Sequence, residues 1–192
     1  LAGTWITDLR VFNGALYFLA SSPVNGGTYD LWKSDGTANG TVLVKQVGAS
    51  LAGLVAANGL LFMAAGDAST GVELWKSDGT ANGTVLVKDI VPGAVGSYPS
   101  DLTAVGNTLY FVAPNNGNGG LWKSDGTTNG TIPVELPPGI IKPTELAELN
   151  GALVFGARRY VDLGADVLGL WKSDGTTAGT ALIKEFDASI VT

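Results

Sequence analysis

The amino-acid sequence predicts an all-β protein, a β-propeller of four four-stranded antiparallel blades, and three observations support this prediction. The segment Leu-Trp-Lys-Ser-Asp-Gly-Thr occurs four times, at residues 31–37, 74–80, 121–127 and 170–176. The copies recur at a spacing of about 45 residues, which is typical of stacked structural repeats. Short runs rich in β-branched and aromatic residues lie between Gly- and Asn-rich turns, which favours strands. We expect a single propeller domain over residues 1–192, with repeats at approximately 1–48, 49–95, 96–140 and 141–192.

Each repeat is expected to form four short strands, and the third repeat illustrates the order. Its first strand is expected at 101–105, and the apolar and aromatic run 108–113 is the second. A Gly- and Asn-rich loop leads to the third strand, 121–124, which ends at an Asp-Gly pair. The fourth strand, 131–136, contains Pro133, whose missing backbone donor suits the edge of a sheet.

The other repeats follow the same order. Asn-Gly pairs separate their first and second strands, as a type I′ hairpin turn requires, because both central residues need positive φ. These pairs are Asn13-Gly14, Asn58-Gly59 and Asn150-Gly151. Four antiparallel strands per repeat, at a period in the forties, are typical of propeller blades. A four-unit β-solenoid or two β-sandwiches would also fit the pattern.

Composition argues against several classes of protein. Only 15% of the 192 residues are charged, against about 25% in a typical domain. The net charge is −6 and the cationic residues are scattered, so no nucleic-acid partner is expected. The chain contains no Cys and no His, which removes disulfides, thiolate metal sites and histidine acid–base catalysis. No apolar run reaches the length of a transmembrane helix, so no membrane insertion is expected.

Residues 73–80, Glu-Leu-Trp-Lys-Ser-Asp-Gly-Thr, resemble the Glu-Leu-Trp-x-x-Asp-Gly-Thr repeat family. The resemblance covers all four repeats, although the first motif position varies between the copies. It implies a propeller-like repeat of secreted and surface proteins of bacteria, and hence an extracellular or cell-surface location. It carries over no catalytic residues, and no cofactor is expected. The chain departs from the family pattern at 132–135 and in an insertion at 158–168, which we interpret as a solvated loop, with a contact loop as the alternative.

The aspartate of each motif is interpreted as a structural turn residue. Its carboxylate can accept backbone N–H groups two or three residues further on, and the following glycine can adopt positive φ. The alternative is calcium or sugar binding, but calcium loops carry several acidic or Asn ligands in a row, and each motif here offers one carboxylate. The four residues are Asp35, Asp78, Asp125 and Asp174.

The tryptophan of each motif has two interpretations. A large ring beside an apolar strand is expected to pack between adjacent blades. The alternative is a sugar-stacking site repeated once per blade. The neighbouring lysines, Lys33, Lys76, Lys123 and Lys172, are expected to cap the ring edge in either case. The four tryptophans are Trp32, Trp75, Trp122 and Trp171.

Three Asn-Gly-Thr triplets match the N-glycosylation acceptor pattern. They begin at Asn39, Asn82 and Asn129, and the fourth repeat has Ala178 instead. Asn-Gly also makes a good turn in its own right, so the triplets are interpreted as turns or as glycosylation sites.

With neither His nor Cys in the chain, and with no spacing that singles out a carboxylate pair, we predict that the protein is not an enzyme. The preferred function is a non-enzymatic structural or interaction module of an extracellular or cell-surface protein, or of a homo-polymeric assembly. The alternatives are a carbohydrate-binding, lectin-like propeller with one site per blade and, third, a glycosidase-like enzyme. Sparse charge and the small number of blades also predict a homo-oligomer, either a ring of two chains or a filament. Glycans and surface proteins are the other expected partners.

Overall fold

The computed structural model describes residues 5–22, 28–48, 52–115, 118–161 and 165–186. These residues form sixteen β-strands arranged in four separate four-stranded sheets, in which strands consecutive in sequence pair antiparallel. The described part of the chain contains no helix, and therefore none that could cross a membrane. The prediction of an all-β fold with four four-stranded antiparallel blades is confirmed.

Each sheet is one blade, and its strands follow in chain order from the first to the fourth. Blade 1 contains β1 (Ile6–Phe12), β2 (Ala15–Ser22), β3 (Thr28–Ser34) and β4 (Val42–Gln46). Blade 2 contains β5 (Ala52–Ala57), β6 (Leu60–Asp67), β7 (Gly71–Ser77) and β8 (Val85–Lys88). Blade 3 contains β9 (Ser100–Val105), β10 (Thr108–Asn115), β11 (Asn118–Ser124) and β12 (Ile132–Pro133). Blade 4 contains β13 (Ile140–Leu149), β14 (Ala152–Val161), β15 (Ala165–Ser173) and β16 (Ala181–Phe186).

The turns between first and second strands have the backbone conformation that their sequences predict. Asn58 and Gly59 both have positive φ, 50° and 70°, as a type I′ turn requires, and the corresponding pairs of blades 1 and 4 match them. In blade 3, Gly106 has a φ of 58° and Asn107 is not in the positive region. Glycine at the first central position is typical of a type II′ turn, so blade 3 makes the same connection with the other hairpin turn.

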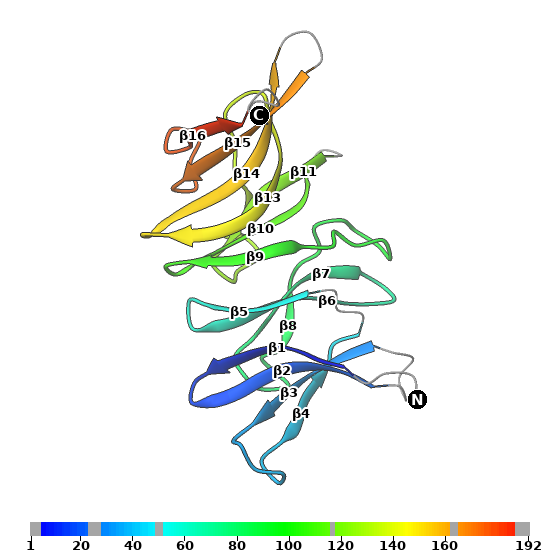
Figure 1. The fold of residues 1–192 in the computed structure, drawn as a ribbon. Helices are drawn as coiled ribbons and strands as arrows, with labels where there is room; N and C mark the ends of the chain where they lie inside the picture. The colour runs from blue at the N-terminus through cyan, green and yellow to red at the C-terminus, as the bar shows by residue number, and fades with distance from the viewer. Residues whose placement is uncertain (1–4, 23–27, 49–51, 116–117, 162–164, 187–192) are drawn as a thin grey trace.

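The four blades pack face to face in a row, with blade 1 at one end and blade 4 at the other (Figure 1). The first strands β1, β5, β9 and β13 lie beside one another along this row. Apolar side chains from facing sheets form three clusters, one between each pair of neighbouring blades. Phe62 and Phe111 meet in the second cluster and Phe155 lies in the third, and all three are fully buried. The core is therefore divided into three layers.

Two segments of blades 3 and 4 differ from the expectation. The fourth strand of blade 3 is reduced to Ile132–Pro133 because Pro133 cannot extend the backbone ladder. The insertion 158–168 is not a solvated loop where the structure describes it, since β14 and β15 continue through it as a longer hairpin, with Arg158 opposite Leu168. Arg159 Nε also donates to Glu185 Oε1 at 2.9 Å, which ties the hairpin to β16. Residues 162–164 of this insertion lie outside the described residues.

Candidate functional site

A hydrogen-bonded turn, here called the Asp turn, joins the third and fourth strands of every blade. In blade 3, Oδ1 of Asp125 accepts hydrogen bonds from the backbone N–H and the hydroxyl of Thr127, both at 2.7 Å. The Thr127 hydroxyl accepts from the N–H of Gly130 at 2.9 Å. The hydroxyls of Ser124 and Thr131 lie 2.8 Å apart and close the base of the turn. The same bonds recur in 34–41, 77–84 and 173–180.

The carboxylate of each Asp turn is engaged within its own turn. Hydrogen bonds from the following threonine lower the pKa of Asp35, Asp78, Asp125 and Asp174, so all four are ionised at neutral pH. A Cβ on Gly130 would lie 2.1 Å from Asp125 Oδ1, so only glycine leaves room for the carboxylate. Each turn supplies one carboxylate, and nowhere in the described ranges do three His, Cys, Asp or Glu side chains gather as metal ligands would.

Three of the four motif tryptophans lie between blades. Trp75 packs against the first apolar cluster, and Trp122 and Trp171, 8% and 6% exposed, belong to the second and third. The Trp122 ring is stacked on Phe111, with 6.2 Å between centroids. Trp32 occupies the corresponding position on the side of blade 1 that faces away from the row, and it is half-buried. The indole nitrogens of the three inter-blade tryptophans are buried, and no described residue accepts a hydrogen bond from them.

The lysines that cover these rings are not the ones expected from the motif. Lys45 Nζ, from the fourth strand of the preceding blade, lies 5.9 Å from the Trp75 ring centroid and donates to the Thr84 carbonyl at 2.7 Å. Lys88 repeats this with Trp122, at 5.8 Å. The motif lysine Lys76 instead donates to the carbonyl of Gly126 in the next Asp turn, at 2.7 Å. The prediction that motif lysines cap the adjacent rings was therefore wrong for Lys76 and Lys123, which extend forward to the next blade.

The glycosylation-pattern asparagines Asn39, Asn82 and Asn129 have exposed side chains in the Asp turns. The threonines of the second and third triplets, Thr84 and Thr131, are fully buried and bonded to serine hydroxyls. The asparagines are therefore at the surface, while the third residue of each of these triplets helps to hold the turn.

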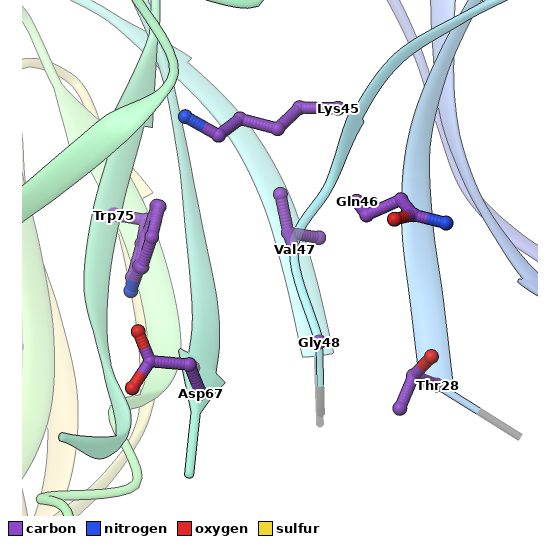
Figure 2. A pocket seen from close by; sticks show the side chains of 8 residues that line it. Thr28, Lys45, Gln46, Val47, Gly48, Asp67 and Trp75 are labelled. Carbon is purple, nitrogen blue, oxygen red and sulfur yellow. The ribbon is translucent and has the colours of Figure 1, made fainter. Parts of the chain in front are cut away.

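A groove between blades 1 and 2 brings together a cationic, an aromatic and an acidic side chain, and we take it as the candidate functional site. It has a volume of about 440 Å³ and is lined by Thr28, Lys45, Gln46, Val47, Gly48, Gly66, Asp67 and Trp75. Figure 2 shows Lys45 across one end of the groove and the Asp67 carboxylate directed toward the indole of Trp75. An ammonium, an aromatic ring and a carboxylate therefore meet in one hollow.

The carboxylate of Asp67 is fixed in place and ionised. Its Oδ1 accepts from the N–H and the hydroxyl of Ser69, at 2.8 and 2.6 Å, and from the N–H of Thr70 at 3.0 Å. These hydrogen bonds, led by the Ser69 hydroxyl, lower the pKa of Asp67 to about 2. Among the described residues, nothing is hydrogen-bonded to Oδ2. Asp67 therefore offers a charged, oriented oxygen to the groove.

A second group of polar residues lies on the first strands of the blades, and no motif in the sequence pointed to it. Each first strand contains a bulge, and the residues at the equivalent bulge position have positive φ: Asp8, Gly53, Asp101 and Glu145. Two residues further on, Arg10 and Thr103 donate to the carbonyls of Leu54 and Leu146 in the next blade. Three acidic residues thus occupy one repeat position, but only the bulge geometry makes this recognisable.

The sequence interpretation also missed Glu73, the first residue of the motif in blade 2. Glu73 is fully buried and accepts a hydrogen bond from the N–H of Val91 at 2.9 Å and another from the Ser97 hydroxyl. Burial raises the pKa of this carboxyl. Glu73 holds the segment after β8 against its own blade, so its role is architectural. The first motif position could have revealed this residue, because only the blade 2 copy carries Glu there.

Comparisons with known proteins connect this fold to larger propeller proteins. No family model and no curated protein matches the sequence. Among solved structures, a puromycin-hydrolyzing peptidase of Mycobacterium tuberculosis matches with a TM-score of 0.61 and 15% identity, over 95% of this chain and 31% of that one. A puromycin hydrolase matches with a TM-score of 0.65 and 14% identity, over 96% of this chain and 29% of that one. TolB of Acinetobacter baumannii matches with a TM-score of 0.54 and 11% identity, over 96% and 44%.

These similarities correct our prediction that the protein is not an enzyme. The propeller is shared, over nearly its whole length, with structures named as hydrolases, so the non-enzymatic module and its lectin-like alternative are withdrawn. The prediction failed because it considered only catalytic side chains within this chain. The chain spans less than half the length of each of these structures, so most of each lies outside the match. At these identities the likeness establishes the fold.

Proposed function

We propose that this chain is the substrate-holding propeller of a hydrolase that acts on a peptide-like amide. The proposal is supported by the names of the two hydrolytic structures that share the fold, and by the groove between blades 1 and 2. One observation carries it. Asp67 presents an ionised, oriented carboxylate oxygen beside the ring of Trp75. An ionised carboxylate held in a fixed orientation suits a protonated amine, which gains a charge-assisted hydrogen bond.

The opposite end of the groove favours a different part of the same ligand. Lys45 places its ammonium there, although it already donates to the carbonyls of Thr84 and Ala81, at 2.7 and 3.3 Å. A positive end and a negative end within one groove orient a ligand that carries an amine at one end and a carbonyl oxygen at the other. The N-terminal residue of a peptide has this arrangement, and so does an aminoacyl amide.

The reacting groups are proposed to come from outside this chain. Amide hydrolysis breaks the C–N bond, places a hydroxyl from water on the carbonyl carbon and a proton on the departing amine. A Ser–His or Cys–His pair commonly performs this step, and the chain has neither His nor Cys. In this proposal the propeller binds and orients the amine end, and another part of the protein attacks the carbonyl.

The experiment is a binding titration with and without the amine. Leucine amide and a Leu-Gly dipeptide are titrated into the protein by calorimetry, alongside their N-acetyl derivatives. We expect the free amines to bind and the acetylated ligands not to bind. Asp67→Asn is expected to weaken binding on the order of tenfold, equivalent to about 1.4 kcal/mol. Asp101→Asn, an exposed carboxylate on β9, is the matched control and is expected to bind as the parent does.

Equal binding of acetylated and free ligands, or unchanged binding by Asp67→Asn, would contradict the groove as the amine site. A hydrolysis assay on leucine amide, read by release of ammonia from the complete native protein, tests the reaction itself. Binding without hydrolysis in that assay would contradict the hydrolase assignment.

We also propose that the chain belongs to the Glu-Leu-Trp-x-x-Asp-Gly-Thr repeat family and is exported to the cell surface or beyond. The fourfold motif supports the family, and the family resemblance supports the location. Immunodetection in fractionated cells of the source organism tests the location, and a signal confined to the cytoplasm would contradict it.

A further inference from the structure

The two ends of the row of blades each present one half of an interface that the chain forms three times internally. The outward side of blade 1, which we call the first end face, includes Leu9, Leu16, Trp32 and Gly36. The outward side of blade 4, the last end face, includes Leu149, Lys172, Ile183, Lys184 and Phe186. Their counterparts at the same repeat positions inside the row pack against the neighbouring blade.

The first end face is open where its internal counterparts are covered. Leu9 is 55% exposed, whereas Leu54, at the same position of blade 2, is fully buried against blade 1. Apart from its chain neighbours, no atom of the described residues lies within 4 Å of a Cβ built on Gly36. A Cβ on Gly79, at the same position of the next Asp turn, would lie 2.3 Å from the Tyr17 hydroxyl of blade 1. The Asp turn of blade 1 therefore lacks the neighbour that the other Asp turns have.

The last end face is open in the opposite direction. Ile183 is 48% exposed, whereas Val87, at the same position of blade 2, is 3% exposed and lies in the second cluster. Phe186 is 50% exposed, against 2% for Val47 at the same position of blade 1. Blade 4 thus shows the apolar side that blades 1 and 2 use to hold the next blade.

The polar groups of the two faces are complementary. Inside the row, the fourth-strand lysine of one blade covers the tryptophan of the next and donates to the carbonyl at the start of its fourth strand, as Lys88 does with Trp122 and Thr131. Lys184 occupies this position on the last end face and is exposed, with no partner in the described part of the chain. Trp32 and the carbonyl of Thr41 are its counterparts on the first end face.

A second donor–acceptor pair also runs from one blade to the next. Lys123 donates to the carbonyl of Gly175 in the Asp turn of blade 4, at 2.9 Å. Lys172 occupies the position of Lys123 on the last end face and is exposed. The carbonyl of Gly36 occupies the position of its acceptor on the first end face. The donors therefore lie on one end face and the acceptors on the other, so each face matches the opposite face of another copy.

We propose that the last end face of one copy docks on the first end face of a second copy, and that two such contacts close a ring of eight blades. Head-to-tail contacts form a closed ring when the rotation from one copy to the next completes a circle. Two copies related by a twofold axis meet this condition. Eight blades lie within the usual range of propellers. The proposal uses an apolar interface that the chain forms three times and polar contacts that it forms twice. It does not depend on the ligand of the groove.

The experiment measures mass in solution by analytical ultracentrifugation of the intact protein. We expect a species of twice the mass of one chain at micromolar concentration. A parent protein that stays at the mass of one chain, or a mass that keeps growing with concentration, overturns the closed pair.

Two single variants identify the faces. Leu9→Asp damages only the first end face and Ile183→Asp only the last, so each variant alone has no intact pair of faces and is expected to sediment as one chain. Their equimolar mixture retains one intact pair, the last face of Leu9→Asp against the first face of Ile183→Asp, and is expected to recover the double mass. A dimeric single variant or a mixture without recovery overturns the proposal. Val95→Asp, an exposed apolar residue away from both faces, is expected to stay dimeric.

Charge reversal at exposed positions provides a second test that does not touch the apolar core. Lys184→Glu and Lys172→Glu, with unchanged circular dichroism, are expected to sediment as one chain when combined. A combined variant that retains both its fold and its double mass overturns the assigned orientation.

Discussion

The interface between blades 2 and 3 and the interface between blades 3 and 4 use the same tryptophan with different neighbours. In the former, Lys88 covers Trp122 and donates to Thr131. In the latter, Glu135 stands where the lysine would be. Thr177 Oγ1 donates to the Glu135 carbonyl at 2.7 Å, much as Thr128 Oγ1 donates to the Val87 carbonyl at 2.8 Å in the former. Tyr110 adds a bond to the Asp174 carbonyl at 3.3 Å. Both tryptophans are nevertheless buried to a similar extent. Packing is therefore the common requirement, and the lysine is an addition to it.

The largest expected effect tests that shared requirement. Trp122→Ala and Trp171→Ala should each lower the free energy of unfolding by about 3–5 kcal/mol, as large aromatic deletions in a core do. The loss at Trp122 should exceed that at Trp171 by about 0.5–1 kcal/mol, because it also removes the contact with Lys88. Urea denaturation followed by circular dichroism measures both values. A Trp171→Ala variant as stable as the parent would show that the third interface does not depend on its indole.

The next effect tests whether the Asp turn is independent of the interface beside it. Ser124→Ala should cost about 1–3 kcal/mol, because it leaves the Gly126 N–H without its partner and removes one of the two hydrogen bonds of the buried Thr131 hydroxyl. Ser173→Ala removes the same bonds from blade 4 and should cost the same. Thermal unfolding compares the two, with the exposed Ser100→Ala as control. Clearly unequal losses would mean that the neighbouring blade contributes to the turn.

A smaller effect is expected from exchanging the residue that distinguishes the two interfaces. Glu135→Lys should stabilise the protein by about 0.5–1 kcal/mol by placing an ammonium over Trp171. Lys88→Glu should destabilise it by at least as much, because it also removes the bond to Thr131. Urea titrations of both variants test this reciprocity. If Glu135→Lys gives no gain, the third interface is too differently shaped to accept the lysine.

The smallest effect concerns pH at the first interface, where Asp67 lies. Its pKa is about 2 in the folded protein and 3.8 as the ordinary value, so the folded state favours the ionised form. Its contribution to stability is full above about pH 4 and is lost as the pH falls from about 4 toward 2. Asp67→Asn should therefore reduce the difference in melting temperature between pH 5 and pH 2.5. At the corresponding position of blade 3 the chain has the uncharged Asn115, so Asn115→Ala should leave this low-pH difference unchanged.

The strands and hairpin turns could be predicted from the sequence because they depend on neighbouring residues. Asn58-Gly59 specifies its turn whatever packs around it, and Pro133 marks a sheet edge by its own chemistry. The 158–168 hairpin was missed because its residues break the repeat pattern that guided the other assignments. Its strand pairing, with Arg158 opposite Leu168, does not depend on the motif.

The candidate site could not be predicted because it belongs to two blades at once. Trp75 and Asp67 come from blade 2, and Lys45 from the preceding blade, so their meeting depends on how the sheets stack. The motif placed a lysine beside each tryptophan in sequence, but Lys76 follows Trp75 on a strand and alternate side chains point to opposite faces. Only the stacking shows that Lys45 supplies the cation. The bulge at Asp8 is likewise invisible in sequence, since most aspartates have negative φ although the residue is enriched in the positive region.

The Asp turn has a consequence for how the chain folds during synthesis. Its side-chain bonds join residues no more than seven apart, such as Ser124 and Thr131, so closing it costs little chain entropy. Loops of this size close in tens of nanoseconds, whereas the ribosome adds a blade of about 45 residues on the order of seconds. The hairpin of the third and fourth strands of each blade can therefore form before the next blade has emerged. The apolar side of that newest blade waits, uncovered, for seconds until its successor arrives, and this interval is when the nascent chain is most exposed to aggregation.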